Sequence, residues 1–85
     1  MISITLDAES ASSVYATDMS IVTKRVGTRI ADLRRTRHRT QEELASGAAI
    51  NRVTLARIET GANVSLELLA RIARALGVTL VDLVR

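Results

Sequence analysis

The stretch that most constrains the fold runs from Thr40 to Gly61, TQEELASGAAINRVTLARIETG, because it places two helical patterns on either side of a turn signal. Thr40 can cap a helix, while Glu43, three positions on, reaches back to the backbone N–H of the cap. Apolar residues then recur at helical spacing: Leu44, Ala45 and Ala48. The segment from Gly47, which tolerates a positive φ, to the capping residue Asn51 interrupts that spacing. The pattern predicts a helix, a tight turn and a second helix.

The second helix has two different sides. Leu55 and Ile58 lie on one side, and Gly61 ends the helix. The other side gathers Arg52, Val53, Ala56, Arg57 and Thr60. The first side belongs to a core, and the second is free to meet a partner. In proteins without zinc or cysteine, this is how a helix is presented to the major groove of DNA.

Apolar periodicity indicates further helices before and after this stretch. A helix from Ser20 to His38, capped by Ser20 or Asp18, is lined by Val22, Val26, Ile30 and Leu33. Ser65 can cap another that ends at Gly77, with an apolar stripe of Leu66, Leu69, Ile72, Ala73 and Leu76. We therefore expect an all-α domain over residues 20–85.

The last predicted helix, about residues 80–84, is apolar for its length and carries Leu80, Val81, Leu83 and Val84. One short terminal helix cannot readily bury that much apolar surface within its own domain, which indicates a dimer interface. The simpler alternative is that Leu80 and Leu83 close the monomer core, and both roles are compatible.

Residues 1–19 form an N-terminal extension. Ile2, Ile4 and Leu6 alternate with polar residues, a pattern typical of a short β-strand. That segment could pair with its copy across a dimer axis, dock on another protein, or stay disordered.

Composition excludes several classes of protein. With 85 residues the chain has room for one small domain, and its core must be aliphatic because Tyr15 is the only aromatic residue. The absence of cysteine excludes disulfide frameworks and zinc modules. No apolar run approaches the roughly 20 residues that span a bilayer. We expect a cytoplasmic protein without a membrane segment.

Charge is spread unevenly along the chain. The net charge is +3, yet all 12 basic residues follow residue 20, and most lie between Lys24 and Arg57. Neutralisation of phosphates is the sequence-independent part of DNA affinity, so this half of the chain suits a nucleic acid. The alternative is that Arg34, Arg35, Arg37 and Arg39 only solvate a helix end and favour its dipole.

The run from Val26 to Val84 closely resembles the lambda Cro and repressor-like helix-turn-helix family, also called XRE-like. The resemblance rests on GTRI-x-x-LR, TQEELA, RIE-x-G and SLELL-x-RIARALGV, which appear in family order and spacing. It implies a five-helix lambda repressor-like fold in which the second and third helices bind DNA.

The resemblance also implies roles for individual residues. Gln41 matches a phosphate-contacting glutamine, Thr54 a position that often touches the DNA backbone, and Arg52, Val53 and Arg57 the base-reading positions. Arginine suits the O6 and N7 of guanine, and valine suits a thymine methyl group. Arg57 could instead bind phosphate or pair with an acid. The predicted DNA-binding set is Gln41, Asn51, Arg52, Val53, Thr54, Arg57, Arg37, His38 and Arg39.

Glu59 corresponds to a structural position in the family, where it pairs with an arginine of the first helix, here Arg34. Losing one partner of such a buried pair costs about 3–5 kcal/mol. His38-Arg39 stands where Gly-Leu is usual, and Ala49 stands where the turn usually has glycine. These departures affect loop geometry and leave a polar loop that could face phosphate.

These features predict a sequence-specific transcriptional regulator, a repressor that binds an inverted-repeat operator in double-stranded DNA as a homodimer. The alternative is an antitoxin that binds a toxin protein and represses its own operon, with residues 1–20 folding onto the toxin. An enzyme is not expected, because His38 is the only histidine and no carboxylates cluster. No metal or cofactor is expected either. RNA binding is disfavoured because stacking aromatic residues are lacking.

Overall fold

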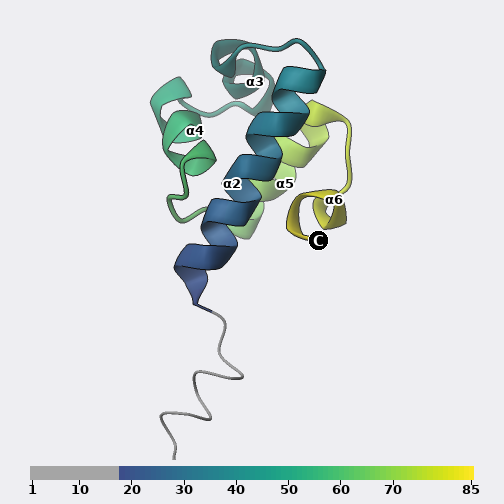
Figure 1. Ribbon diagram of the computed structural model, residues 1–85. Helices are drawn as coiled ribbons and strands as arrows, with labels where there is room; N and C mark the ends of the chain where they lie inside the picture. Colours follow the sequence, from purple (N-terminus) through teal and green to yellow (C-terminus); the bar gives the residue numbers. More distant parts are fainter. Residues whose placement is uncertain (1–17) are drawn as a thin grey trace, which may run out of the picture.

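The computed structural model describes residues 18–85, and this part of the chain is all-helical (Figure 1). The helices are α2 (Met19–Thr36), α3 (Gln41–Ala48), α4 (Arg52–Glu59), α5 (Leu66–Leu76) and α6 (Leu80–Val84). The predicted five-helix fold is therefore confirmed. The strand expected near Ile2 lies outside the described residues. No helix among those described is long and apolar enough to cross a membrane.

Side-chain caps start every one of these helices, because the first N–H groups of a helix have no partner within it. Asp18, rather than Ser20, caps α2 by accepting from the Ser20 N–H at 2.9 Å. Thr40 and Glu43 form the predicted capping box at α3. The remaining caps are Asn51 for α4, Ser65 for α5 and Thr79 for α6.

The turn between α3 and α4 differs from the expectation in one respect. Gly47, predicted to provide the positive φ, lies inside α3, and the left-handed residue is Ala49, with φ 58° and ψ 45°. The helix continues past Gly47 because Ala48 still packs into the core, at 3% exposure. Gly77 ends α5 in the left-handed region, as predicted, with φ 74°.

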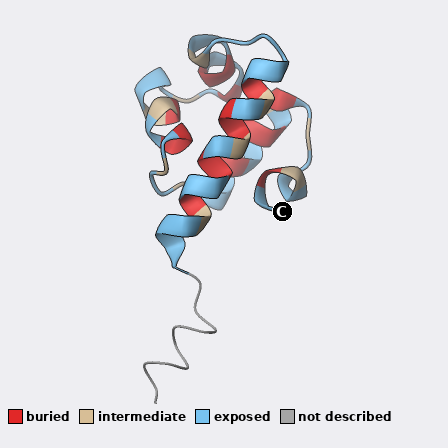
Figure 2. Cartoon of the chain, in the orientation of Figure 1, coloured by how far each residue is buried: buried red, intermediate tan, exposed pale blue. Residues whose placement is uncertain are grey.

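Long helix α2 crosses the front of the molecule, with α4 on one side, α6 on the other and α5 behind it (Figure 1). The buried faces of the helices converge on one aliphatic core (Figure 2). Its fully enclosed members are Ile30, Leu44, Leu55, Ile58, Ile72 and Leu83. Leu66, expected in the stripe of α5, is instead 72% exposed, because as the first helical residue it lies beyond the edge of this core.

Contact between α2 and α4 is close enough to require a glycine. A Cβ atom built on Gly27 would lie 2.2 Å from the carbonyl oxygen of Ile58 and 2.8 Å from that of Glu59. Both oxygens belong to the backbone of α4, so they cannot move without moving the helix. Gly27 therefore fixes how closely α4 approaches α2.

Candidate nucleic-acid interface

Helix α4 buries one side and leaves the other uncovered. Leu55 and Ile58 are 0% and 2% exposed. Arg52, Val53, Arg57 and Thr60 are exposed on the opposite side, and Thr54 and Ala56 are half-buried between the two sides. We call the exposed set, Arg52, Val53, Arg57 and Thr60, the open side of α4.

Not every polar group on or beside this open side is available to a ligand. The Oδ1 atom of Asn51 caps α4, since it accepts a hydrogen bond from the Val53 N–H at 2.7 Å. Thr60 turns its hydroxyl back to the Ala56 and Arg57 carbonyls, at 3.2 and 3.0 Å. Within residues 18–85, the Arg57 guanidinium has no hydrogen-bond or ion-pair partner. Its donors are therefore not engaged by any of the described residues.

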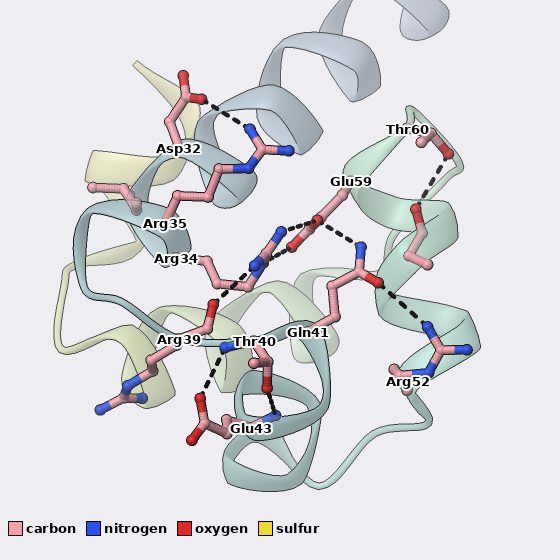
Figure 3. Close-up of polar contacts among 12 residues, drawn as sticks. Asp32, Arg34, Arg35, Arg39, Thr40, Gln41, Glu43, Arg52, Glu59 and Thr60 are labelled. Carbon is pink, nitrogen blue, oxygen red and sulfur yellow. Dashed lines mark hydrogen bonds and ion pairs between the residues drawn. The ribbon is translucent and has the colours of Figure 1, made fainter.

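Buried beneath α4 is the ion pair that the resemblance implies (Figure 3). Arg34 on α2 binds Glu59 at the end of α4 in two-pronged fashion, with Nε–Oε2 at 2.8 Å and Nη2–Oε1 at 3.1 Å. The side chains are 11% and 4% exposed. The third arginine nitrogen, Nη1, donates to the Arg39 carbonyl at 2.8 Å. One guanidinium thus ties α2 to α4 and to the loop before α3.

Gln41, the first residue of α3, extends this network to the open side of α4. Its Nε2 donates to Glu59 Oε1 at 2.9 Å, and its Oε1 accepts from Arg52 Nη1 at 3.4 Å (Figure 3). The sequence analysis predicted that Gln41 contacts a DNA phosphate, and it did not predict either of these hydrogen bonds. Arg52 and Glu59 are seven positions apart in one helix, a spacing that returns to the same face, but nothing in that spacing places Gln41 beside them.

The loop that joins α2 to α3 was predicted to face phosphate through Arg37, His38 and Arg39, and Arg39 makes a contact within the chain that this prediction did not include. Its Nη1 donates to the Ala75 carbonyl near the end of α5, and its guanidinium points away from Arg52 (Figure 3). The reason is electrostatic, because the C-terminal end of a helix attracts a cation. Arg37 and His38 are exposed, the latter with φ 55°.

Helix α6 presents a second candidate surface, which is apolar. Leu80, Val81 and Val84 are 37%, 60% and 49% exposed, and together they form what we call the α6 surface. Leu83, for which the sequence analysis considered both this interface and the monomer core, is 1% exposed and belongs to the monomer core. Residues two positions apart in a helix point to nearly opposite sides, so Leu83 faces the core while Val81 faces outward.

Comparison with known proteins agrees with this architecture. A family model described as Helix-turn-helix, HTH_3, matches residues 30–83. Among solved structures, the crystal structure of the clp gene regulator ClgR from C. glutamicum is similar, with a TM-score of 0.70 and 30% sequence identity. That similarity covers 73% of this chain and 82% of the other. No curated protein matches the chain.

Proposed function

The chain belongs to the helix-turn-helix family, and from this premise we propose that it represses transcription by binding a specific inverted-repeat operator as a homodimer. At the level of the family it is a DNA-binding transcriptional regulator rather than an enzyme. The inverted-repeat operator, the homodimer and repression are proposed in addition to this family assignment.

One observation carries the proposal: the open side of α4 is uncovered and cationic. Helix α4 comes directly after the turn from α3, which sets its position. Arg52 and Arg57 are both exposed, and Val53 is 47% exposed between them. Arginine can donate two hydrogen bonds to the O6 and N7 of guanine, and the valine methyl groups suit the methyl group of thymine. This combination supports direct reading of base edges in the major groove.

Dimerisation is proposed because one short helix reads few base pairs. The α6 surface supplies an apolar patch, and it lies on the other side of α2 from α4 (Figure 1). A second copy bound there leaves the open side of α4 uncovered. Two such copies related by a two-fold axis present two α4 helices to successive major grooves, about 34 Å apart.

Repression is the simplest outcome of this arrangement, because a dimer seated near a promoter occludes RNA polymerase. The solved structure of a gene regulator with similar architecture supports a role in transcription. In a purified transcription reaction, we expect the protein to lower initiation from a promoter that overlaps its site. A promoter with the site moved well upstream is the control.

The decisive test is selection of bound sites from random DNA duplexes by the purified protein. We expect enrichment of an inverted repeat whose half-site centres lie about 10 base pairs apart, one helical turn. Enrichment of a single half-site would remove the dimer from the proposal. Failure to enrich any sequence would overturn specific recognition as a whole.

A further inference from the structure

A hollow of about 500 Å³ lies along the exposed face of α2 and reaches the residue that follows α6 (Figure 1). Four of the six residues that line it are basic, and the full set is Lys24, Arg25, Thr28, Arg29, Asp32 and Arg85. The one carboxylate side chain among them, that of Asp32, pairs with the exposed Arg35 at 3.6 Å. We call this hollow the α2–α6 groove.

The groove lies on the side of α2 that faces away from α4. Arg25 and Arg29 each stand two positions from Gly27, the residue against which α4 packs. Two positions in a helix correspond to a rotation of roughly 200° about its axis. DNA bound along the open side of α4 therefore lies away from these two cations, and the proposed function leaves their charge without a role.

The stability of the domain does not explain these cations either. Arg25 and Arg29 are four positions apart, and like charges at that spacing repel each other across one helical turn. Within residues 18–85, Lys24 and Arg25 make no ion pair and donate no hydrogen bond from their side chains. An anionic ligand in the groove would offset the repulsion.

Arg29 is held in place before any ligand binds. It is half-buried, and its Nε donates to the Asp82 carbonyl at 2.8 Å. This bond restrains the guanidinium, while Nη1 and Nη2 have no partner among the described residues. A restrained arginine loses less freedom on binding an anion, and its paired N–H donors match the oxygens of a phosphate.

The spacing of the donors indicates a ligand with more than one anionic group. Arg25 and Arg29 lie about 6 Å apart along the helix axis, since each residue adds about 1.5 Å. A single carboxylate or phosphate engages one of these two levels, whereas a chain of linked phosphates has charge and acceptor oxygens for both. The hollow also falls within the range of roughly 300–1,000 Å³ that is usual for small-molecule sites.

We propose that the α2–α6 groove binds a small molecule that carries two or more linked phosphates. Arg29 is its fixed contact, and Arg25 and Lys24 neutralise the remaining charge. This site does not depend on the proposed function, because none of these three residues lies on the open side of α4.

The test is a calorimetric titration of the full chain with inorganic triphosphate at physiological ionic strength, which screens distant surface charges. Arg25→Gln and Thr28→Glu each make the groove less positive by one charge. Arg57→Gln makes the same change on the open side of α4, at an arginine that is also exposed and unpartnered within the described residues. All three positions are exposed, and unfolding titrations check that the variants keep the fold.

We expect saturable binding, with NMR shifts of the backbone amides of Thr28 and Arg85. Arg25→Gln and Thr28→Glu should each weaken the binding of triphosphate about tenfold, the effect of losing one hydrogen bond to a charged group. Arg57→Gln should leave triphosphate binding unchanged, although it should weaken the binding of DNA.

Three results would overturn the proposal. Equal weakening in all three variants would mean diffuse attraction of an anion to a basic protein. A loss confined to Arg57→Gln would place the triphosphate on the open side of α4, and the absence of saturable binding would leave no site at all. None of these results bears on operator recognition, which the selection of bound duplexes tests separately.

Discussion

Ala49 shows how a single residue can hold a turn at some cost in stability. Its φ of 58° lies in the left-handed region, which costs an L-residue with a Cβ about 1–2 kcal/mol. Glycine avoids that strain but loses about 0.5–1 kcal/mol through the greater freedom of the unfolded chain. We therefore expect Ala49→Gly to raise the free energy of unfolding by about 0.5–1 kcal/mol in urea titrations.

Gly77 provides the reverse control for that prediction. It adopts nearly the same conformation, with φ 74°, and a Cβ there would meet nothing within 4 Å. Gly77→Ala therefore tests backbone strain alone, and it should destabilise by about 1 kcal/mol. If Ala49→Gly destabilised as well, strain at the turn would not be what limits stability.

Gly27 makes the opposite kind of contribution, because its lack of a side chain lets two helices meet. With Ile58 O at 2.2 Å from the missing Cβ, Gly27→Ala must push α4 away from α2. Overpacking of this kind costs about 1–3 kcal/mol, and the shift should also weaken DNA binding. Unfolding titrations and binding to the selected operator measure the two effects.

The matched variant is Gly47→Ala, in the last turn of α3. A Cβ at this position would lie 3.5 Å from Ala75 Cβ, an ordinary contact, so the higher helix propensity of alanine should dominate. We expect an increase in stability of about 0.5–1 kcal/mol. A loss in both variants would mean that any Cβ is harmful in these helices, irrespective of the α2–α4 contact.

At the scale of whole elements, local chemistry made the helix boundaries predictable. The capping box of Thr40 and Glu43, the Asn51 cap and the Gly77 terminus each involve side chains within a few positions of the backbone they satisfy. Periodicity likewise located the core positions of α4, since Leu55 and Ile58 are both buried.

Residues whose surroundings come from distant parts of the chain were not predictable in this way. Arg39 bonds to Ala75 on α5, and Gln41 meets Glu59 on α4, contacts that no local pattern encodes. Leu66 continues the stripe of α5 in sequence but lies beyond the edge of the core. The Arg34–Glu59 pair was anticipated through family resemblance and not through spacing.

Helix α6 should respond to acid through its capping box. Hydrogen bonds from the Thr79 backbone N–H, then from its hydroxyl, hold the pKa of Asp82 below its ordinary value of 3.8. A carboxylate with a lowered pKa stabilises the fold at neutral pH, and this contribution disappears as the pH falls through that lowered value.

We therefore expect the start of α6 to fray below pH 3.8, which can be followed by NMR through the Thr79 amide signal. In Asp82→Asn, the same signal should lose its response to acid. A Thr79 amide that shifts equally in both proteins would assign the acid response to another group.

At the scale of the whole molecule, α2 separates the two candidate surfaces and supports both. On one side, Gly27 and Arg34 set the position of α4. On the other, Arg29 Nε donates to the Asp82 carbonyl at 2.8 Å and ties α6 to the same helix. The distance between the open side of α4 and the α6 surface is thus fixed within each copy. In a dimer, that distance determines the spacing of half-sites.

The α6 surface leads to the last prediction, which concerns assembly. Val81 is 60% exposed, and in Val81→Asp a charge would be buried in the proposed interface without a partner. We expect this variant to be monomeric by sedimentation and to keep its helical content. Because the two half-sites then bind independently, affinity for the inverted repeat should fall about 100-fold or more, while binding to a single half-site stays unchanged.

Leu66→Asp is the matched control, since Leu66 is 72% exposed on α5 and lies outside the α6 surface. This change adds the same charge to an equally apolar position, and it should leave the dimer intact. If Leu66→Asp dissociated the dimer and Val81→Asp did not, the subunits would meet through the start of α5. The half-site spacing would then follow from the position of α5 relative to α4, because the two-fold axis would pass beside that helix.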